Sequence, residues 1–186
     1  DYVNNSNLVE EAIDMVQYSR ADSVYICTTP DYNMYTPDST NPQDIIYSQE
    51  AVDNLDNTGI DSNYTATYYP WILTRDTVNN TQIYLPPTGE VCRNLALTDN
   101  ISFPWFASAG YTRGLVNSIK ARQKLTQTDR DTLYQGRINP IATFSDVGTV
   151  IWGNKTLQIA DTALNRLNVR RLLLQARKLI SAVAVR

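Results

Sequence analysis

The sequence has no histidine among its 186 residues. Histidine is the commonest general base and takes part in serine triads, cysteine–histidine pairs and most zinc sites, so its absence excludes these forms of chemistry. GxGxxG, P-loop, HExxH, GxSxG and CxxC strings are absent as well. We therefore predict no catalytic residue, no metal and no cofactor. The separation of a carboxylate pair for glycoside hydrolysis is a three-dimensional quantity, which leaves an unrecognised hydrolase open as a third interpretation.

Cysteine is scarce, with Cys27 and Cys92 alone. Cys27 lies in the apolar string SVYICTT and Cys92 near an expected helix start, and neither position fits a metal or redox motif, so we predict two buried free thiols. Three carboxylates, Asp31, Asp38 and Asp44, fall in a stretch rich in turn-forming residues. Their spacing of seven and six residues matches no EF-hand. We expect them to be solvated in a surface loop.

Long apolar runs are missing too. No stretch approaches the roughly 18–20 apolar residues of a membrane helix, and the N-terminal string DYVNNSNLVEE has neither the basic nor the apolar region of a signal peptide. We expect a soluble chain without a secretion signal. A hydrophobic content of 42% is enough for one sizeable core, so we predict a single domain over residues 1–186.

Basic side chains are rare in the first part of the chain. Residues 1–110 hold 3 basic and 15 acidic side chains, and residues 111–186 hold 13 basic and 4 acidic ones, which gives net charges of -12 and +9. If the two segments lie on opposite faces, the acidic face of one copy can meet the basic face of the next and build rings or filaments. If the charges intermingle on the folded surface, the asymmetry has no such consequence.

Helix-like and strand-like patterns alternate along the chain. Asn7, Thr88 and Asn168 are expected to cap helices, and Pro70 is expected at an edge, a bulge or a strand end because it has no N–H to donate. Residues 100–114 have no regular pattern. The sequence therefore predicts an α/β fold with a mixed, partly parallel β-sheet flanked by helices. Helices are expected over residues 8–18, 43–55, 88–97, 128–134 and 168–186, and strands over residues 23–29, 64–74, 82–85, 138–144 and 148–153.

The last helix carries two basic pairs. Arg170 and Arg177 are seven residues apart, as are Arg171 and Lys178, so each pair shares a face. We predict that these four side chains meet an acidic protein partner, with a solvated helix face as the alternative. The helix pattern reaches the last residue without a stop signal, which indicates a chain that has been cut.

Five strings carry a resemblance to a known family. Two lie upstream: IDSNYTATYYPWILT from Ile60 and YLPPTGEVCRNLALTD from Tyr84. Three follow: PWFASAGYTRG from Pro104, RINPIATFSDVGTVIWGNKTL from Arg137 and LNRLNVRRLLLQARKLI from Leu164. In this order and at this spacing they resemble the core of contractile tail sheath proteins, the outer sleeve of bacteriophage contractile tails and related injection machines. The resemblance covers roughly residues 48–180.

The resemblance implies a structural subunit without catalytic activity, and an incomplete fragment of the sheath core domain that lacks the terminal linking arms. Subunits of this family stack as hexameric rings around an inner tube, and their arms add strands to a neighbour's sheet. The implied partners are further copies of the subunit, the inner tail tube protein, and baseplate and tail terminator proteins, with no direct nucleic acid contact and no membrane insertion. The implied location is the virion tail, assembled in the cytoplasm of the bacterial host.

A nucleic-acid-binding domain is the alternative function. The basic segment 111–186 would neutralise phosphates, and Tyr111 or Trp152 would stack on bases. The net charge of -12 on the rest of the chain opposes this function. The apolar neighbours of Trp152 in VIWG and of Trp71 in YYPW favour core packing for both tryptophans, and we predict that both are core residues.

Overall fold

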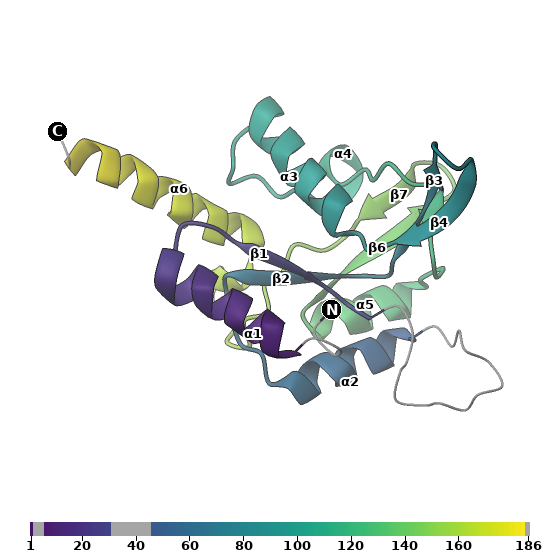
Figure 1. Ribbon diagram of the computed structural model, residues 1–186, viewed down its shortest axis with the longest axis horizontal. Coiled ribbons are helices and arrows are strands. Elements are labelled where there is room, and N and C mark those ends of the chain that lie inside the picture. The colour runs from purple at the N-terminus through teal and green to yellow at the C-terminus, as the bar shows by residue number, and fades with distance from the viewer. Residues whose placement is uncertain (2–5, 31–45, 185–186) are drawn as a thin grey trace.

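Three layers make up the fold in this computed structural model, which describes residues 1, 6–30 and 46–184. A β-sheet lies in the middle, with helices on both of its faces (Figure 1). The loop carboxylates Asp31, Asp38 and Asp44 lie outside the described residues. No helix in the described part is both long and apolar enough to cross a membrane.

The central sheet has four strands in the order β1-β2-β6-β7. Neighbours β1, β2 and β6 run parallel to one another, and β7 is antiparallel to β6. The prediction of a mixed, partly parallel sheet flanked by helices is therefore confirmed. The four strands are β1 (Tyr25–Thr28), β2 (Thr65–Tyr69), β6 (Ile138–Phe144) and β7 (Gly148–Ile151).

Each face of this sheet has its own core. Successive strand residues point to opposite faces, so Tyr69 joins one cluster of buried side chains and Tyr68 joins the other. The first cluster packs under α1 (Ser6–Asp14), which continues into the π-helix η1 (Met15–Arg20), and under α2 (Ser48–Thr58) and α5 (Gln127–Gln135). The second packs under α3 (Thr88–Ile101), α4 (Gly110–Arg113) and the start of α6 (Leu167–Ala184).

A smaller sheet in the order β4-β3-β5 extends from the end of β2. Sequence reasoning placed one strand over residues 64–74, and this was wrong: the chain breaks at Pro70, after a cis Tyr69–Pro70 bond. Pro70 thus occupies a strand end, one of its predicted places. The chain then turns at Asn79 and Asn80 and returns as an antiparallel hairpin. The strands are β3 (Ile72–Asp76), β4 (Thr81–Leu85) and β5 (Lys120–Ala121).

Several local predictions need correction. Asn7 and Asn168 lie inside helices rather than at their caps, and Pro87 takes the cap position predicted for Thr88. Residues 100–114 contain the end of α3 and all of α4, so they are less irregular than expected. A short 3-10 turn, η2 (Ala163–Asn165), precedes α6. Helix ends commonly differ from expectation by one or two residues. A hydroxyl or amide side chain can also hydrogen-bond to other backbone groups instead of capping a helix.

The two cysteines are free, as predicted, but only Cys27 is buried. Burial raises the pKa of the Cys27 thiol to about 11, which makes it unreactive. Cys92 is exposed, so the prediction of two buried thiols was wrong for it. The neighbouring Val91 is the α3 residue that packs into the core.

Asn139 ties the end of β6 to its neighbours. Its Nδ2 donates to the carbonyl oxygens of Thr67 at 3.0 Å and Lys155 at 2.8 Å, and its Oδ1 accepts from the Lys155 N–H at 2.6 Å. Gly153 makes this possible, because a Cβ at Gly153 would lie 2.7 Å from the Asn139 Oδ1. The contact fixes the segment that leads from β7 toward α6.

Candidate assembly interface

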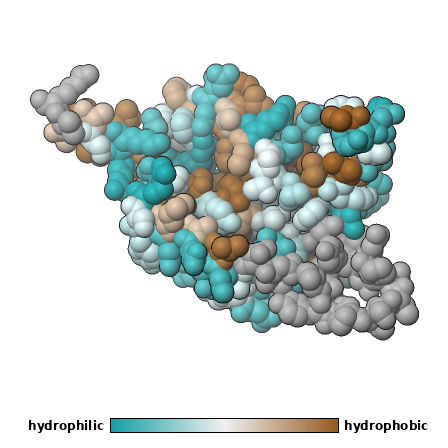
Figure 2. All heavy atoms as spheres, viewed as in Figure 1, coloured by the Kyte–Doolittle hydropathy of each residue, from teal (hydrophilic) through white to brown (hydrophobic). Residues whose placement is uncertain are grey.

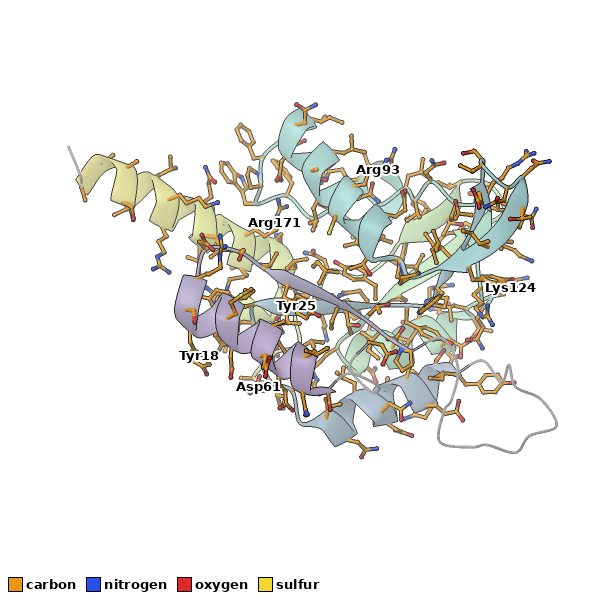
Figure 3. All side chains as sticks on the ribbon, in the orientation of Figure 1. Tyr18, Tyr25, Asp61, Arg93, Lys124 and Arg171 are labelled. Carbon is orange, nitrogen blue, oxygen red and sulfur yellow. The ribbon has the colours of Figure 1, made fainter. Side chains whose placement is uncertain are left out.

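Two of the four predicted interface residues are held within the chain. Arg171 forms an ion pair with Asp99 of α3 at 2.5 Å, with only 12% of the arginine side chain exposed. Figure 3 shows Arg171 between α6 and α3. Arg170 lies over the Tyr64 ring, 3.8 Å from its centroid, and donates to Asn63. Burial lowers the pKa of Arg170, although Tyr64 opposes this effect.

The other two basic residues are more accessible. Arg177 and Lys178 are both exposed, and Arg177 donates to the Ala21 carbonyl at 2.8 Å. Lys178 lines a shallow depression of about 340 Å³ that also contains Asp22 and Asp99. An acidic partner of all four residues stays a prediction, and the structure places Arg177 and Lys178 where such a partner can reach them.

The exposed face of α6 is apolar. Buried Leu167 and Leu174 face the body of the protein, and Arg170 and Arg171 flank them. The side chains on the opposite face recur at helical spacing and are exposed. Figure 2 shows hydrophobic atoms at the surface over α3 and the outer part of α6. The exposed set on α6, here called the α6 stripe, is Leu172, Leu173, Leu179, Ile180 and Val183.

Aromatic side chains add to the apolar surface. Phe103 and Trp105 stack with their centroids 4.7 Å apart, and both are exposed beside the start of α6. Trp152 was predicted to be a core residue, but 39% of it is exposed, so this prediction was wrong. Val150 and Ile151 of the same string are buried, and Trp152 instead packs edge-on against Tyr111. Trp152 directly follows the last residue of β7.

Trp71 also differs from a fully buried core residue. It is half-buried, and its indole N–H donates to the Thr29 carbonyl at 2.9 Å. The other aromatics of the string YYPW, Tyr68 and Tyr69, are buried in the two cores. Core packing is therefore confirmed for the tyrosines and not for the tryptophan at the strand break.

A groove of about 510 Å³ opens between α3, α4 and the β6–β7 turn; we call it the α3–α4 groove. Its apolar wall comes from Leu97, Ile101, Leu115, Val116 and Val147. Two cations, Arg93 and Arg113, also line it. Sequence reasoning missed this groove because its walls come from three segments that are distant in sequence.

Catalytic geometry is not evident in the part of the chain that the structure describes. Those residues hold no group of three or more histidine, cysteine, aspartate or glutamate side chains able to bind a metal ion. Carboxylates in ion pairs or caps have structural roles: Asp56 pairs with Arg137 at 2.7 Å, and Asp129 accepts a hydrogen bond from the Thr126 hydroxyl. The most distinctive features are therefore surfaces: the α6 stripe, the aromatic cluster and the groove.

Comparison with known proteins finds similarity to phage tail sheath proteins. No family model matches the chain. Over 141 residues, or 73% of its length, the chain is 36% identical to the tail sheath protein of Vibrio phage KVP40. Over 183 residues, or 91% of its length, it is 29% identical to the tail sheath protein of Enterobacteria phage T4. This chain is homologous to tail sheath proteins. The family resemblance read from its five strings is confirmed.

The match is to a segment of each relative. The chain spans 20% of the KVP40 sheath protein and 26% of the T4 sheath protein. Among solved structures, the sheath complex of the PVC extracellular contractile injection system, in its contracted state, superposes with a TM-score of 0.65. That likeness covers 86% of this chain and 40% of the neighbour at 23% identity, so it shows a shared fold. The chain thus has the α/β fold expected from its sequence.

Proposed function

We propose that the chain is part of a structural subunit of a contractile tail sheath and has no catalytic role. The observation that carries this proposal is its 36% identity to a phage tail sheath protein over 73% of the chain. The surfaces support it, since contiguous exposed apolar patches on a soluble protein mark sites of interaction. The subunit would polymerise with copies of itself as stacked hexameric rings around an inner tail tube.

Contraction would be a change of packing between copies. The sleeve would relax from a metastable extended state to a shorter one and drive the tube through a bacterial envelope during genome delivery. Each copy would move as a nearly rigid body, because packed cores resist deformation while interfaces can be bistable. Baseplate and tail terminator proteins would bind the ends of the sleeve. The subunit would reside in the phage tail and assemble in the host cytoplasm.

Electron microscopy of the purified protein tests this proposal. Long hollow tubes, or sleeves on intact tails, are the expected result. A protein that stays monomeric at high concentration, in the presence and absence of the inner tube, would contradict a polymeric role.

The basic residues of α6 would contribute to a contact with an acidic partner, either the inner tube or a neighbouring copy. We expect Arg177→Glu with Lys178→Glu to impair sleeve assembly, because reversing exposed charges at an interface repels the partner. Circular dichroism should show that the fold is intact. Arg171→Glu serves for comparison. It breaks the internal ion pair with Asp99, so we expect it to lower the stability of the fold itself.

Nucleic acid binding receives no support from the placement of these residues. Arg170 and Arg171 are engaged within the chain, and α1 and α2 together carry six carboxylates and no basic side chain. We expect no saturable binding of labelled DNA at near-physiological salt, measured by fluorescence anisotropy. Micromolar binding that weakens steeply with salt and disappears when the four α6 residues are changed would overturn this expectation.

A further inference from the structure

We propose that the α3–α4 groove binds the exposed face of α1 and η1 from a second copy of this chain. The contact rests on the proposed function, because it joins copies of one subunit within a polymer. It specifies which two surfaces meet. An amphipathic helix in an apolar groove is a recurrent mode of protein recognition, with anchors three and four residues apart.

The groove is suited to an apolar segment that carries negative charge. Its volume of about 510 Å³ lies within the range of roughly 300–1,000 Å³ typical of ligand pockets. Among the described residues that line it, none is acidic, and Arg93 and Arg113 are both cationic. Arg93 is paired with Glu90 at 3.3 Å, whereas Arg113 forms no ion pair with any described residue. Its Cζ lies 4.9 Å from the Phe106 ring centroid.

Asn94 gives the groove an unused hydrogen-bond donor. This side chain lines the groove and is only 3% exposed, yet its Nδ2 donates to no group in the described part of the chain. A buried amide without a partner costs free energy. A carboxylate or carbonyl oxygen from a bound segment would satisfy it once the side chain turns toward the groove, because the Nδ2 has almost no accessible surface in the free chain.

The helix α1 and its continuation η1 present a complementary surface. Leu8, Glu11, Met15 and Tyr18 recur at spacings of three, four and three residues, and all four are exposed. Glu10, Glu11 and Asp14 form no ion pair with any residue that the structure describes. The surface thus combines apolar anchors with carboxylates, as the groove requires.

The two surfaces lie on opposite sides of the sheet. α1 packs on one core and α3 on the other, and Figure 3 shows Tyr18 and Arg93 on opposite sides of the strands. A copy therefore cannot fill its own groove. A contact between different surfaces of identical copies is heterologous, and it propagates into a ring or a helical filament. The second copy is favoured over another partner because one sequence carries both the cationic apolar groove and the acidic helix with apolar anchors.

Disulfide trapping tests the contact in the whole chain. Met15→Cys and Leu97→Cys are introduced together with Cys92→Ser, so that the remaining native thiol, Cys27, is buried. Under mild oxidation, denaturing gels should show a ladder of linked multimers, because each copy carries both halves of the contact. The matched control pairs Met15→Cys with Val78→Cys, an exposed residue at the tip of the β3–β4 hairpin. Its yield of multimers should be about tenfold lower.

Microscopy of the same samples separates the two proposals. Tubes that form without the ladder would overturn the groove contact and leave the sheath function standing. A control ladder as strong as the test ladder would also overturn the contact, because the linkage would then be unspecific. The absence of both tubes and ladder at high concentration would contradict both proposals.

A charge swap provides a second measurement that does not depend on thiol geometry. Glu11→Arg with Asp14→Arg should lower the yield of the ladder about tenfold, and Arg93→Glu with Arg113→Glu should do the same, since like charges then face each other. All four changes in one chain should restore the ladder. If the combined variant is as poor as either pair, the opposed charges do not meet and the proposal is wrong.

Discussion

The two helical layers differ in how completely they cover their large apolar side chains. In the layer of α1, α2 and α5, the exposed large apolar side chains are limited to Leu8 of α1 and to Met15 and Tyr18 of η1 among the described helices. The layer of α3, α4 and α6 leaves eight exposed: Leu97, Ile101, Tyr111, Leu172, Leu173, Leu179, Ile180 and Val183. The first, here called the closed layer, buries most of its large apolar side chains in the fold. The second, here called the open layer, keeps a larger apolar surface that a partner can cover.

Charge divides the two layers in the same way. α1 and α2 hold six carboxylates and no basic side chain, and α6 holds four basic side chains and no acidic one. The asymmetry along the sequence therefore persists between these helices, while the ion pairs Arg171–Asp99 and Arg137–Asp56 join the acidic and basic segments within one copy. An acidic helix of one copy facing a basic helix of the next would favour head-to-tail contacts.

The largest effect is expected in the closed layer. Leu55 of α2 is fully buried, so Leu55→Ala should lower the free energy of unfolding by about 2–5 kcal/mol through lost burial and a cavity. Urea denaturation measures this loss. The matched change in the open layer, Leu173→Ala, should alter stability by less than about 1 kcal/mol because Leu173 is 45% exposed. Equal losses for the two leucines would remove the distinction between the layers.

A slightly smaller loss of stability is expected in the central sheet, which lies between the two helical layers. Asn139→Ala removes three hydrogen bonds and leaves the Thr67 carbonyl and the Lys155 backbone groups without this partner. We expect a loss of about 2–3 kcal/mol in thermal or urea unfolding, since buried polar groups without partners cost about 1–3 kcal/mol each. Asn154→Ala, which removes a part-buried side-chain bond to Asn168, is the control and should cost less.

Trp152 gives a sharper test of the open layer. A core tryptophan would cost about 3–5 kcal/mol on truncation, but Trp152 is partly exposed and packs against Tyr111 and Phe144. Trp152→Ala should therefore cost about 1–2 kcal/mol, which combines partial burial with aromatic pairing. A loss above about 3 kcal/mol in urea denaturation would restore the core assignment.

The smallest effect concerns the start of α5. Hydrogen bonds from the Thr126 hydroxyl and backbone N–H hold the pKa of Asp129 below its ordinary value. A carboxyl whose folded pKa is lowered stabilises the fold above its unfolded pKa, and this contribution is lost as the pH falls through the folded pKa. Thr126→Ala should cost about 1 kcal/mol at neutral pH. The stability difference between the native chain and Asp129→Asn should shrink toward zero in acid; a constant difference would contradict the capping role.

Sequence patterns predicted the elements whose signals are local. The strands β6 and β7 and the helix α5 match the ranges expected from the sequence to within two residues. The orientation of α6 was harder, because both the apolar and the basic positions recur at helical spacing. Only the fold shows that Leu167 and Leu174 face inward and the α6 stripe outward.

Residues that join distant segments also escaped prediction. The Arg137 guanidinium binds the carbonyl oxygens of Ile60 and Leu157 and the carboxylate of Asp56, across as many as 81 residues of sequence. No periodicity marks such a contact. The α3–α4 groove was missed for the same reason, since it exists only when α3, α4 and the β6–β7 turn are brought together.

Hydroxyl-radical footprinting of free and assembled protein tests whether the open layer is an assembly surface. We expect Ile101, Leu173 and Ile180, all exposed in the isolated chain, to become protected when tubes form. Val78 at the tip of the β3–β4 hairpin provides an exposed reference in the free chain. Equal oxidation of Ile101, Leu173 and Ile180 in the free and assembled states would contradict the account.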